Sequence, residues 1–153
     1  MASITHKHPR PTKHAPHFEA IVKRIEKPFS NRPMDDLDWI CASLGFLEPI
    51  DRKATASAVF KEILRATEEG RRVSSSDLAR RVGMSRGSVT NHLGNLLRSG
   101  LIVRNGRFYA ARSRSMQRTL EEIEGDVKRV FEKMRSAAQG IDREFGIPAQ
   151  KQQ

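Results

Sequence analysis

The sequence predicts a mainly α-helical protein with one small β-hairpin and a long carboxy-terminal helix. Three observations support this fold class. Segments with apolar residues at helical spacing recur before residue 100. The pair Asn105-Gly106 lies between two short runs of β-branched and aromatic residues, which is typical of a hairpin. A heptad pattern then follows towards the carboxyl end.

The chain has 153 residues, enough for one compact domain with extensions but too few for two full domains. Residues 1–17 are rich in Pro and His and offer little to bury, so we expect a disordered basic arm. The other expected segments are an amino-terminal helical segment at 18–50, a domain at 51–114, a long helix at 115–146 and a flexible tail at 147–153.

Two helices are expected in the amino-terminal segment. The first covers Phe18 to Lys27, because apolar residues recur there with a helical period and Pro28 ends it. The second covers Met34 to Leu44 and ends at Gly45. Cys41 lies on its apolar face and is expected to be a packed thiol.

Three more elements are expected before the helix at 85–99. Ala54 to Glu69 has the helical period, with Gly70 as its stop. Val73 is expected in a short strand or bridge. Ser74 and Asp77 have the spacing of a capping box, so a second short helix is expected to begin there.

A third helix is expected at 85–99, with Ser85 as its cap and Gly100 as its terminator. Its inward seam consists of Val89, Leu93, Leu96 and Leu97. The opposite face contains no acidic residue and consists of Arg86, Gly87, Thr90, Asn91, Gly94, Asn95 and Arg98.

The composition of this face suits the major groove of DNA. Asn can pair bidentately with adenine and Arg with guanine, while Thr can donate a hydrogen bond or touch the thymine methyl. Gly87 and Gly94 each cost the helix roughly 1 kcal/mol relative to Ala. Close approach of DNA would account for them, and close packing of another helix is the alternative for Gly94.

The hairpin is expected at 101–110, with Asn105-Gly106 as a two-residue type I′ loop. This loop places Arg104 opposite Arg107 and Val103 opposite Phe108. Two facing arginines are unfavourable unless an anion lies between them, so both are candidates for contact with a phosphate or a narrow minor groove.

Charge is concentrated in the same part of the chain. Of the formal net charge of +10, residues 51–114 carry +9, because they hold 14 of the 28 Lys and Arg but only 5 of the 18 Asp and Glu. Such a local excess attracts a polyanion, although a solvated basic surface is the alternative interpretation.

VSSSDLARRVGMSRGSVTNHLGNLLRSGLIVRNGRFY resembles the winged helix-turn-helix of bacterial and archaeal regulators of the MarR and ArsR types. The matching motifs are S-x-x-[DE]-L-A, S-x-x-[ST]-V-[ST]-x-H-L and L-x-x-x-G-L-[IV], within Ala54 to Ala111. The resemblance implies that His92 packs or contacts phosphate rather than binding metal. It also implies DNA contacts from Ser85, Arg86, Gly87, Thr90, Asn91, Arg104 and Arg107, and the polar face adds Asn95 and Arg98.

Metal binding is not expected. Cys41 is the one cysteine, so the Cys clusters of arsenical-type sensors are absent from the sequence. The arm contains His6, His8, His14 and His17 but no acidic or Cys neighbour to complete a site. Two interpretations of the arm remain: it binds DNA phosphates through its basic residues, or it has no role.

Met116 to Ile141 has apolar residues alternately four and three positions apart. At about 1.5 Å per residue the predicted helix is roughly 40 Å long, more than a core of this size can cover. We therefore expect a coiled-coil homodimer; a helix folded back along its own domain is the alternative. Phe131 widens the stripe, so an amino-terminal helix could also pack there. The expected dimer interface is Met116, Leu120, Ile123, Val127, Val130, Met134, Ala137 and Ile141.

These observations predict a homodimeric, sequence-specific transcriptional regulator that binds double-stranded DNA, with residues 85–99 in the major groove and 101–110 on the backbone or minor groove. The alternatives are a non-specific nucleoid protein and a winged-helix module for protein interaction. Catalytic motifs are not apparent, so neither an enzyme nor a cofactor is expected. Without a long apolar run or a signal-peptide pattern, we expect no membrane contact and a cytoplasmic location. The sequence does not indicate an effector or an operator.

Overall fold

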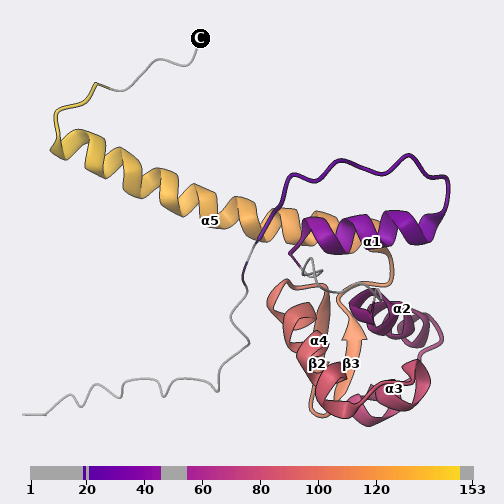
Figure 1. Cartoon of the computed structure of the whole chain (residues 1–153). Coiled ribbons are helices and arrows are strands. Elements are labelled where there is room, and N and C mark those ends of the chain that lie inside the picture. Colours follow the sequence, from indigo (N-terminus) through magenta and orange to yellow (C-terminus); the bar gives the residue numbers. More distant parts are fainter. Residues whose placement is uncertain (1–18, 20, 46–54, 149–153) are drawn as a thin grey trace, which may run out of the picture.

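The fold is known from a computed structural model that describes residues 19, 21–45 and 55–148 (Figure 1). The arm predicted at residues 1–17 and most of the predicted tail lie outside the described residues. The elements follow in the order α1 (Pro33–Ser43), α2 (Thr55–Glu68), β1 (Val73–Ser74), α3 (Ser75–Val82), α4 (Arg86–Arg98), β2 (Ile102–Asn105), β3 (Phe108–Ala111) and α5 (Met116–Glu144). The predicted fold class, mainly α with a small β-hairpin and a long last helix, is confirmed.

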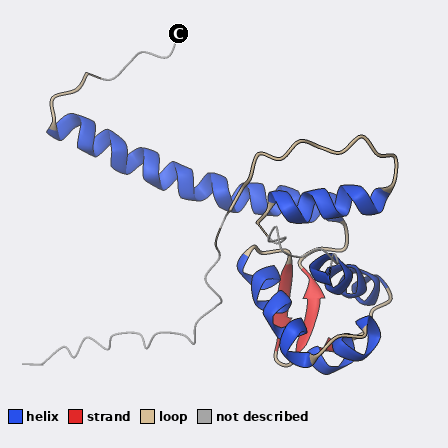
Figure 2. Ribbon diagram, viewed as in Figure 1, coloured by secondary structure: helices blue, strands red, loops and turns tan. Residues whose placement is uncertain are grey.

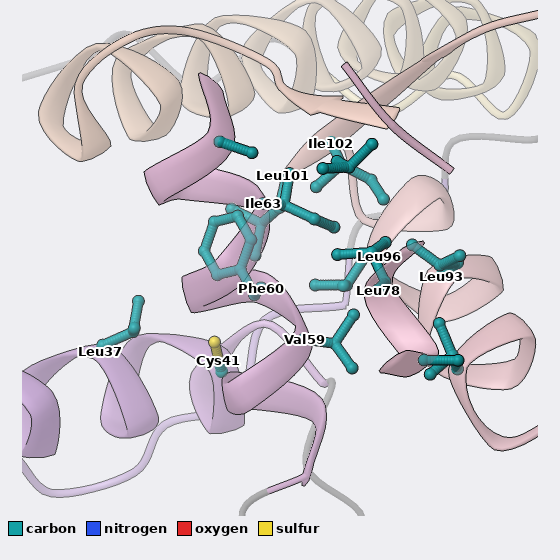
Figure 3. Close-up of a cluster of buried hydrophobic side chains, with 14 of the residues drawn as sticks. Leu37, Cys41, Val59, Phe60, Ile63, Leu78, Leu93, Leu96, Leu101 and Ile102 are labelled. Atoms are coloured by element: carbon teal, nitrogen blue, oxygen red, sulfur yellow. The ribbon is translucent and has the colours of Figure 1, made fainter. Parts of the chain in front are cut away.

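A single apolar cluster holds these elements together (Figure 3). Its centre is formed by α2, α3 and α4 with the start of β2, because their predicted apolar faces meet there. Helices α1 and α5 cover this centre with Leu37, Cys41 and Ile123. The largest fully buried side chains include Phe60, Ile63, Leu78, Leu93, Leu96, Leu101 and Ile102.

Cys41 is packed as the sequence predicts, with 1% of its surface exposed. Burial raises the pKa of its thiol to about 12, with a smaller contribution from the nearby Asp38 carboxylate. Because the thiolate is the reactive form, a thiol with this pKa is inert at neutral pH.

The strands form one antiparallel sheet in the order β1-β3-β2, and the hairpin lies between α4 and α2 (Figure 2). Val73 pairs with Tyr109, and both lie on the face that packs against the core. Phe108 is the partner of both Ser74 and Asn105, so these three side chains share the outer face. The outer face is therefore open to contacts outside the core.

The capping box predicted at the start of α3 is confirmed. The Asp77 amide donates to Ser74 Oγ at 3.3 Å, and the Ser74 amide donates to Asp77 Oδ2 at 2.9 Å. The Ser74 hydroxyl also donates to the same carboxylate oxygen at 2.7 Å. These hydrogen bonds from Ser74, with a smaller contribution from Arg80, lower the pKa of Asp77 to about 2.

The lowered pKa of Asp77 predicts how the free energy of unfolding of the domain changes at acid pH. Because the pKa of Asp77 falls from 3.8 to about 2 on folding, its contribution is complete above pH 3.8 and is lost as pH falls towards 2. We expect Asp77→Asn to be less stable than the wild type at pH 7, and the difference to shrink between pH 4 and pH 2. Urea unfolding at a series of pH values measures it, and a difference that stays constant across this window would contradict the assignment.

The helix predicted from Phe18 to Lys27 is wrong for the residues that the structure describes, which run as irregular chain. Their backbone groups instead bond to distant elements: the Glu19 amide donates to Arg98 O at 2.8 Å and the Lys23 amide to Ser43 O at 2.7 Å. Trp39 Nε1 donates to Ile25 O at 3.0 Å. A helix of this length is marginal alone, so tertiary hydrogen bonds outweigh the helical period of the sequence.

The predicted hairpin forms, but its register is shifted by two residues along β3. Asn105 pairs with Phe108, so the loop is Gly106-Arg107 rather than Asn105-Gly106. Gly106 has φ +62°, which type I′ and II′ turns require at this first loop position. The shift places Ile102 opposite Ala111, where both side chains are buried in the core. A shift of two residues keeps every side chain on its predicted face, so the apolar pattern of the strands fits both registers.

Helix α5 divides into a packed root and a projecting half. In the root, Ile123 is 5% exposed within the core, and Met116 and Val127 pack against it. Beyond Val127 the helix leaves the rest of the molecule (Figure 1). The alternative in which the whole helix folds back along its own domain is therefore not observed.

The root of α5 is joined to the end of β3 by ion pairs. Arg112 Nε lies 3.0 Å from Glu122 Oε2, and Arg112 Nη2 lies 2.7 Å from Asp126 Oδ2. The Ser113 hydroxyl donates to Glu122 Oε1 at 2.9 Å. Ser113 and then Arg112 lower the pKa of Glu122, with a further contribution from Arg118, so the carboxylate is ionised at neutral pH.

Candidate nucleic-acid interface

The predicted contact residues of α4 lie along its outward face. Ser85, Arg86, Gly87, Thr90, Asn91 and Arg98 are exposed, and Asn95 is half-buried. Of the predicted inward seam, Val89, Leu93 and Leu96 are each at most 1% exposed, and Leu97 is half-buried against the core. The apolar seam thus fixes the orientation of the helix, and the polar face is left to solvent.

Some of these side chains already have partners within the helix. Ser85 Oγ accepts from the Ser88 amide at 3.2 Å as the cap, and Thr90 Oγ1 donates to Arg86 O at 2.8 Å. In the described part of the chain, the side chains of Arg86 and Asn91 form no hydrogen bond. These two therefore keep all their donors and acceptors for a ligand.

The carboxyl end of the same face is partly occupied by the chain itself. Arg98 donates to the Asn95 side-chain oxygen, and both line a small hollow with Glu19 and Ile21. The predicted contacts Asn95 and Arg98 are thus separated from the open amino-terminal half of α4. This could not be predicted from the sequence, because Glu19 and Ile21 come from a distant part of the chain.

The two glycines of α4 are not required by packing inside the chain. A Cβ at Gly87 would meet nothing within 4 Å, and one at Gly94 would meet only Arg98 Nη1 at 3.8 Å. Close packing of another helix, the alternative for Gly94, is therefore not found among the described residues. A side chain at either position would therefore point into open space on the outward side of α4.

His92 lies at the inner edge of the same helix. It is half-buried, and its Nε2 lies 3.1 Å from Thr55 Oγ1 at the start of α2. This contact is consistent with the packing role that the family resemblance implies for His92.

Arginines of the domain fall into two groups. Arg65, Arg71 and Arg81 all pair with Glu62, whose side chain is only 9% exposed. Arg80 pairs with Asp77. The pairs of Arg71 and Arg81 hold the loop before β1 and helix α3 to α2, whereas those of Arg65 and Arg80 lie within one helix. Within the described residues, no ion pair is formed by Arg72, Arg86, Arg98, Arg104 or Arg107.

The unpaired arginines of the hairpin lie over aromatic rings. Arg104 lies 5.7 Å from the Tyr109 ring centroid, and its Nε donates to Gly106 O at 2.7 Å. Arg107 lies 5.0 Å from the Phe108 ring centroid. The predicted opposition of Arg104 and Arg107 is wrong, since the observed register pairs Arg104 with Tyr109. Their exposure is as predicted, but the argument from facing like charges does not apply to them.

The hairpin is attached firmly to the helical core. The Ala111 amide donates to Thr67 Oγ1 at 2.9 Å, and that hydroxyl donates to Ile63 O at 2.8 Å in α2. The Arg112 amide donates to Leu101 O at 3.0 Å. These bonds fix the position of the hairpin on α2 and close its base.

Three packed helices followed by an antiparallel hairpin, with an exposed polar face on the third helix, define a winged helix-turn-helix domain. Residues 61–103 match a family model described as winged helix-turn-helix DNA-binding, from within α2 to within β2. The chain therefore carries a winged helix-turn-helix DNA-binding domain, as its motifs predict. Comparison with curated proteins and with solved structures gave no match.

The matched model does not distinguish the MarR from the ArsR type, so that part of the resemblance stays a prediction. Among the residues that the structure describes, no group of three His, Cys, Asp or Glu could hold a metal ion. No helix in the same residues is both long and apolar enough to cross a membrane.

The predicted dimer residues lie on both parts of α5. Met116, Ile123 and Val127 contact the core of their own chain, so this part of the predicted seam is already used. In the projecting half, Val130, Met134 and Ile141 are 48%, 50% and 57% exposed. Phe131 is also 55% exposed, so the described residues leave its ring largely open.

Sequence reasoning missed Arg72. Its guanidinium lies 4.7 Å from the Phe108 ring centroid, beside the hairpin. The short strand expected at Val73 could have indicated it, because Arg72 and Ser74 lie on the same face of an extended segment. That signal is not sufficient alone, because the pairing of β1 with β3 joins residues far apart in the chain.

Proposed function

We propose that the protein is a sequence-specific transcriptional regulator that acts in the cytoplasm as a homodimer and binds duplex DNA without catalysis. The exposed face of α4 carries this proposal. It lacks acidic residues, and Arg86 and Asn91 have no side-chain partner among the described residues. Arg and Asn are the side chains that read guanine and adenine bidentately, so α4 suits the major groove.

The wing suits contact with the DNA backbone or the minor groove. Arg104 and Arg107 are exposed, are not engaged by carboxylates within the described residues, and lie on a hairpin fixed to the core. Arginines placed in this way position a domain on DNA without reading bases. A protein-interaction module would instead offer aromatic or aliphatic anchors, and the outward face of α4 has none.

Dimerisation is supported by the projecting half of α5. Val130, Phe131, Met134 and Ile141 are between 48% and 57% exposed on this half. An apolar stripe with a heptad repeat that continues past the domain is best buried by the same stripe of a second copy. Two copies would carry two α4 helices related by a two-fold axis, and would read half-sites about one helical turn apart.

Selection of bound sequences from a random duplex pool tests the proposal. We expect a palindromic consensus, and loss of base preference at one position of each half-site in Arg86→Ala and in Asn91→Ala. Each change should cost roughly 1–3 kcal/mol of binding to the consensus. Arg135→Ala is the matched control, since Arg135 is an exposed arginine of the projecting helix.

The alternatives give different results in the same experiment. A non-specific nucleoid protein would yield no consensus and would be displaced by unrelated DNA at physiological salt. A protein-interaction module would bind no DNA under these conditions. Wild-type affinity and preference in both α4 variants would contradict the assignment of α4 as the reading helix.

A further inference from the structure

Two arginines from different parts of the chain share one aromatic ring on the outer face of the sheet. Phe108 begins β3, and the guanidiniums of Arg72 and Arg107 lie 4.7 Å and 5.0 Å from its ring centroid. Arg107 belongs to the hairpin loop, whereas Arg72 belongs to the connection between α2 and β1. The ring therefore brings together two positive charges that are 35 positions apart in the sequence.

The position of Arg72 is fixed by its neighbours on both sides. Arg71 pairs with Glu62 and Glu69, and its amide donates to Ala66 O at 2.8 Å. Val73 is 1% exposed within the core. With both neighbours anchored, the backbone at Arg72 has little freedom, while its own side chain is exposed. Little conformational entropy is then lost when this side chain binds a ligand.

This arrangement leaves an uncompensated pair of cations. Each guanidinium is attracted to the ring, but the two repel one another, and within the described residues neither forms an ion pair. A guanidinium stacked on a ring keeps its N–H edges free, and these edges match the oxygens of a phosphate. An anion bound beside this ring would be attracted to both charges.

We propose that Arg72, Phe108 and Arg107 form a binding site for a phosphodiester group of the DNA backbone. The site rests on the proposed function, and it adds the connection before β1 to the DNA-contacting surface. The two guanidiniums donate to the phosphate oxygens, and Phe108 holds their planes in place. A site of this kind strengthens binding to every sequence alike and carries no base preference.

Arg72→Ala tests the site through the salt dependence of DNA affinity. Loss of one phosphate contact lowers the slope of log K against log salt by about 0.9. We expect Arg72→Ala to bind the selected consensus and unrelated duplexes roughly tenfold more weakly, as loss of one charged hydrogen bond implies, with an unchanged consensus. Arg135→Ala, which removes an exposed arginine from the projecting half of α5, should keep the wild-type slope.

Phe108→Leu tests the contribution of the aromatic ring separately from that of the two charges. Both arginines remain, so the salt slope should stay near the wild-type value, while affinity falls several-fold because the guanidiniums are no longer held. Thermal unfolding of each variant verifies that the domain is folded. Arg72→Lys should recover the slope but only part of the affinity, since an ammonium cannot stack or bind in a bidentate manner.

The outcomes distinguish this site from the proposed function. If Arg86→Ala and Asn91→Ala lose base preference while Arg72→Ala keeps the wild-type affinity and slope, the phosphate site is wrong and the function stands. If the wild type selects no consensus, the proposed function is wrong. A change of consensus in Arg72→Ala would also overturn the site, because it would mean base readout.

Discussion

Met134→Glu is expected to convert the dimer into a monomer and to weaken binding to a two-half-site operator by at least about a hundredfold. Met134 is 50% exposed in the middle of the projecting half of α5. In the proposed dimer it lies at the seam, where a glutamate would bury a charge in each copy without a partner. Loss of the second α4 then removes the avidity gain of two linked sites, which is typically 10²–10⁴.

Arg135→Glu is the matched control for this change. It introduces the same side chain one position along the same helix and alters the net charge further, but it lies beside the seam rather than in it. Light scattering should find this variant dimeric and Met134→Glu monomeric. A Met134→Glu protein that stays dimeric would contradict the α5 interface, whatever its affinity for DNA.

Phe60→Ala is expected to destabilise the domain by about 3–5 kcal/mol, a large part of the roughly 5–15 kcal/mol by which domains of this size are stable. Phe60 is fully buried on α2, among the side chains of the central cluster (Figure 3). Its removal loses apolar burial and leaves a cavity between helices that are held apart by other contacts.

Urea unfolding measures this cost, and the Met134→Glu background keeps the transition free of dissociation. The neighbouring Lys61 is exposed on the same helix, so Lys61→Ala should change the free energy of unfolding by no more than about 0.5 kcal/mol. A loss below 1 kcal/mol in Phe60→Ala would mean that the cluster is not the core of the domain.

The helices of the DNA-binding domain could be predicted because their signals are local. The capping box of Ser74 and Asp77, the cap at Ser85 and the seam through Leu93 all lie within the elements they define. Such features depend on residues three or four positions apart, so they can be recognised from residues that are close together in the sequence.

Features that depend on distant partners could not be predicted in the same way. The segment near Lys23 has a helical period, but its amide bonds to Ser43 O, twenty residues away. The observed hairpin register pairs Ile102 with Ala111, and the Ala111 amide donates to the distant Thr67 Oγ1 in α2. A two-residue shift leaves the apolar pattern of both faces unchanged, so that pattern does not distinguish this register from the one with Asn105-Gly106 as the loop. The heptad of α5 is continuous in sequence, yet Ile123 belongs to the core of its own chain.

The ion pairs of Arg112 have a consequence for how two DNA-binding domains would meet an operator. Only residues 112–115 separate β3 from α5, and Arg112 binds both Glu122 and Asp126 across this junction. A connection so short and so cross-linked leaves few rotational degrees of freedom between the wing and the helix. In the proposed dimer, the separation of the two α4 helices is thus preorganised in the free protein. The entropy of aligning them is lost during folding and assembly, and it no longer opposes DNA binding.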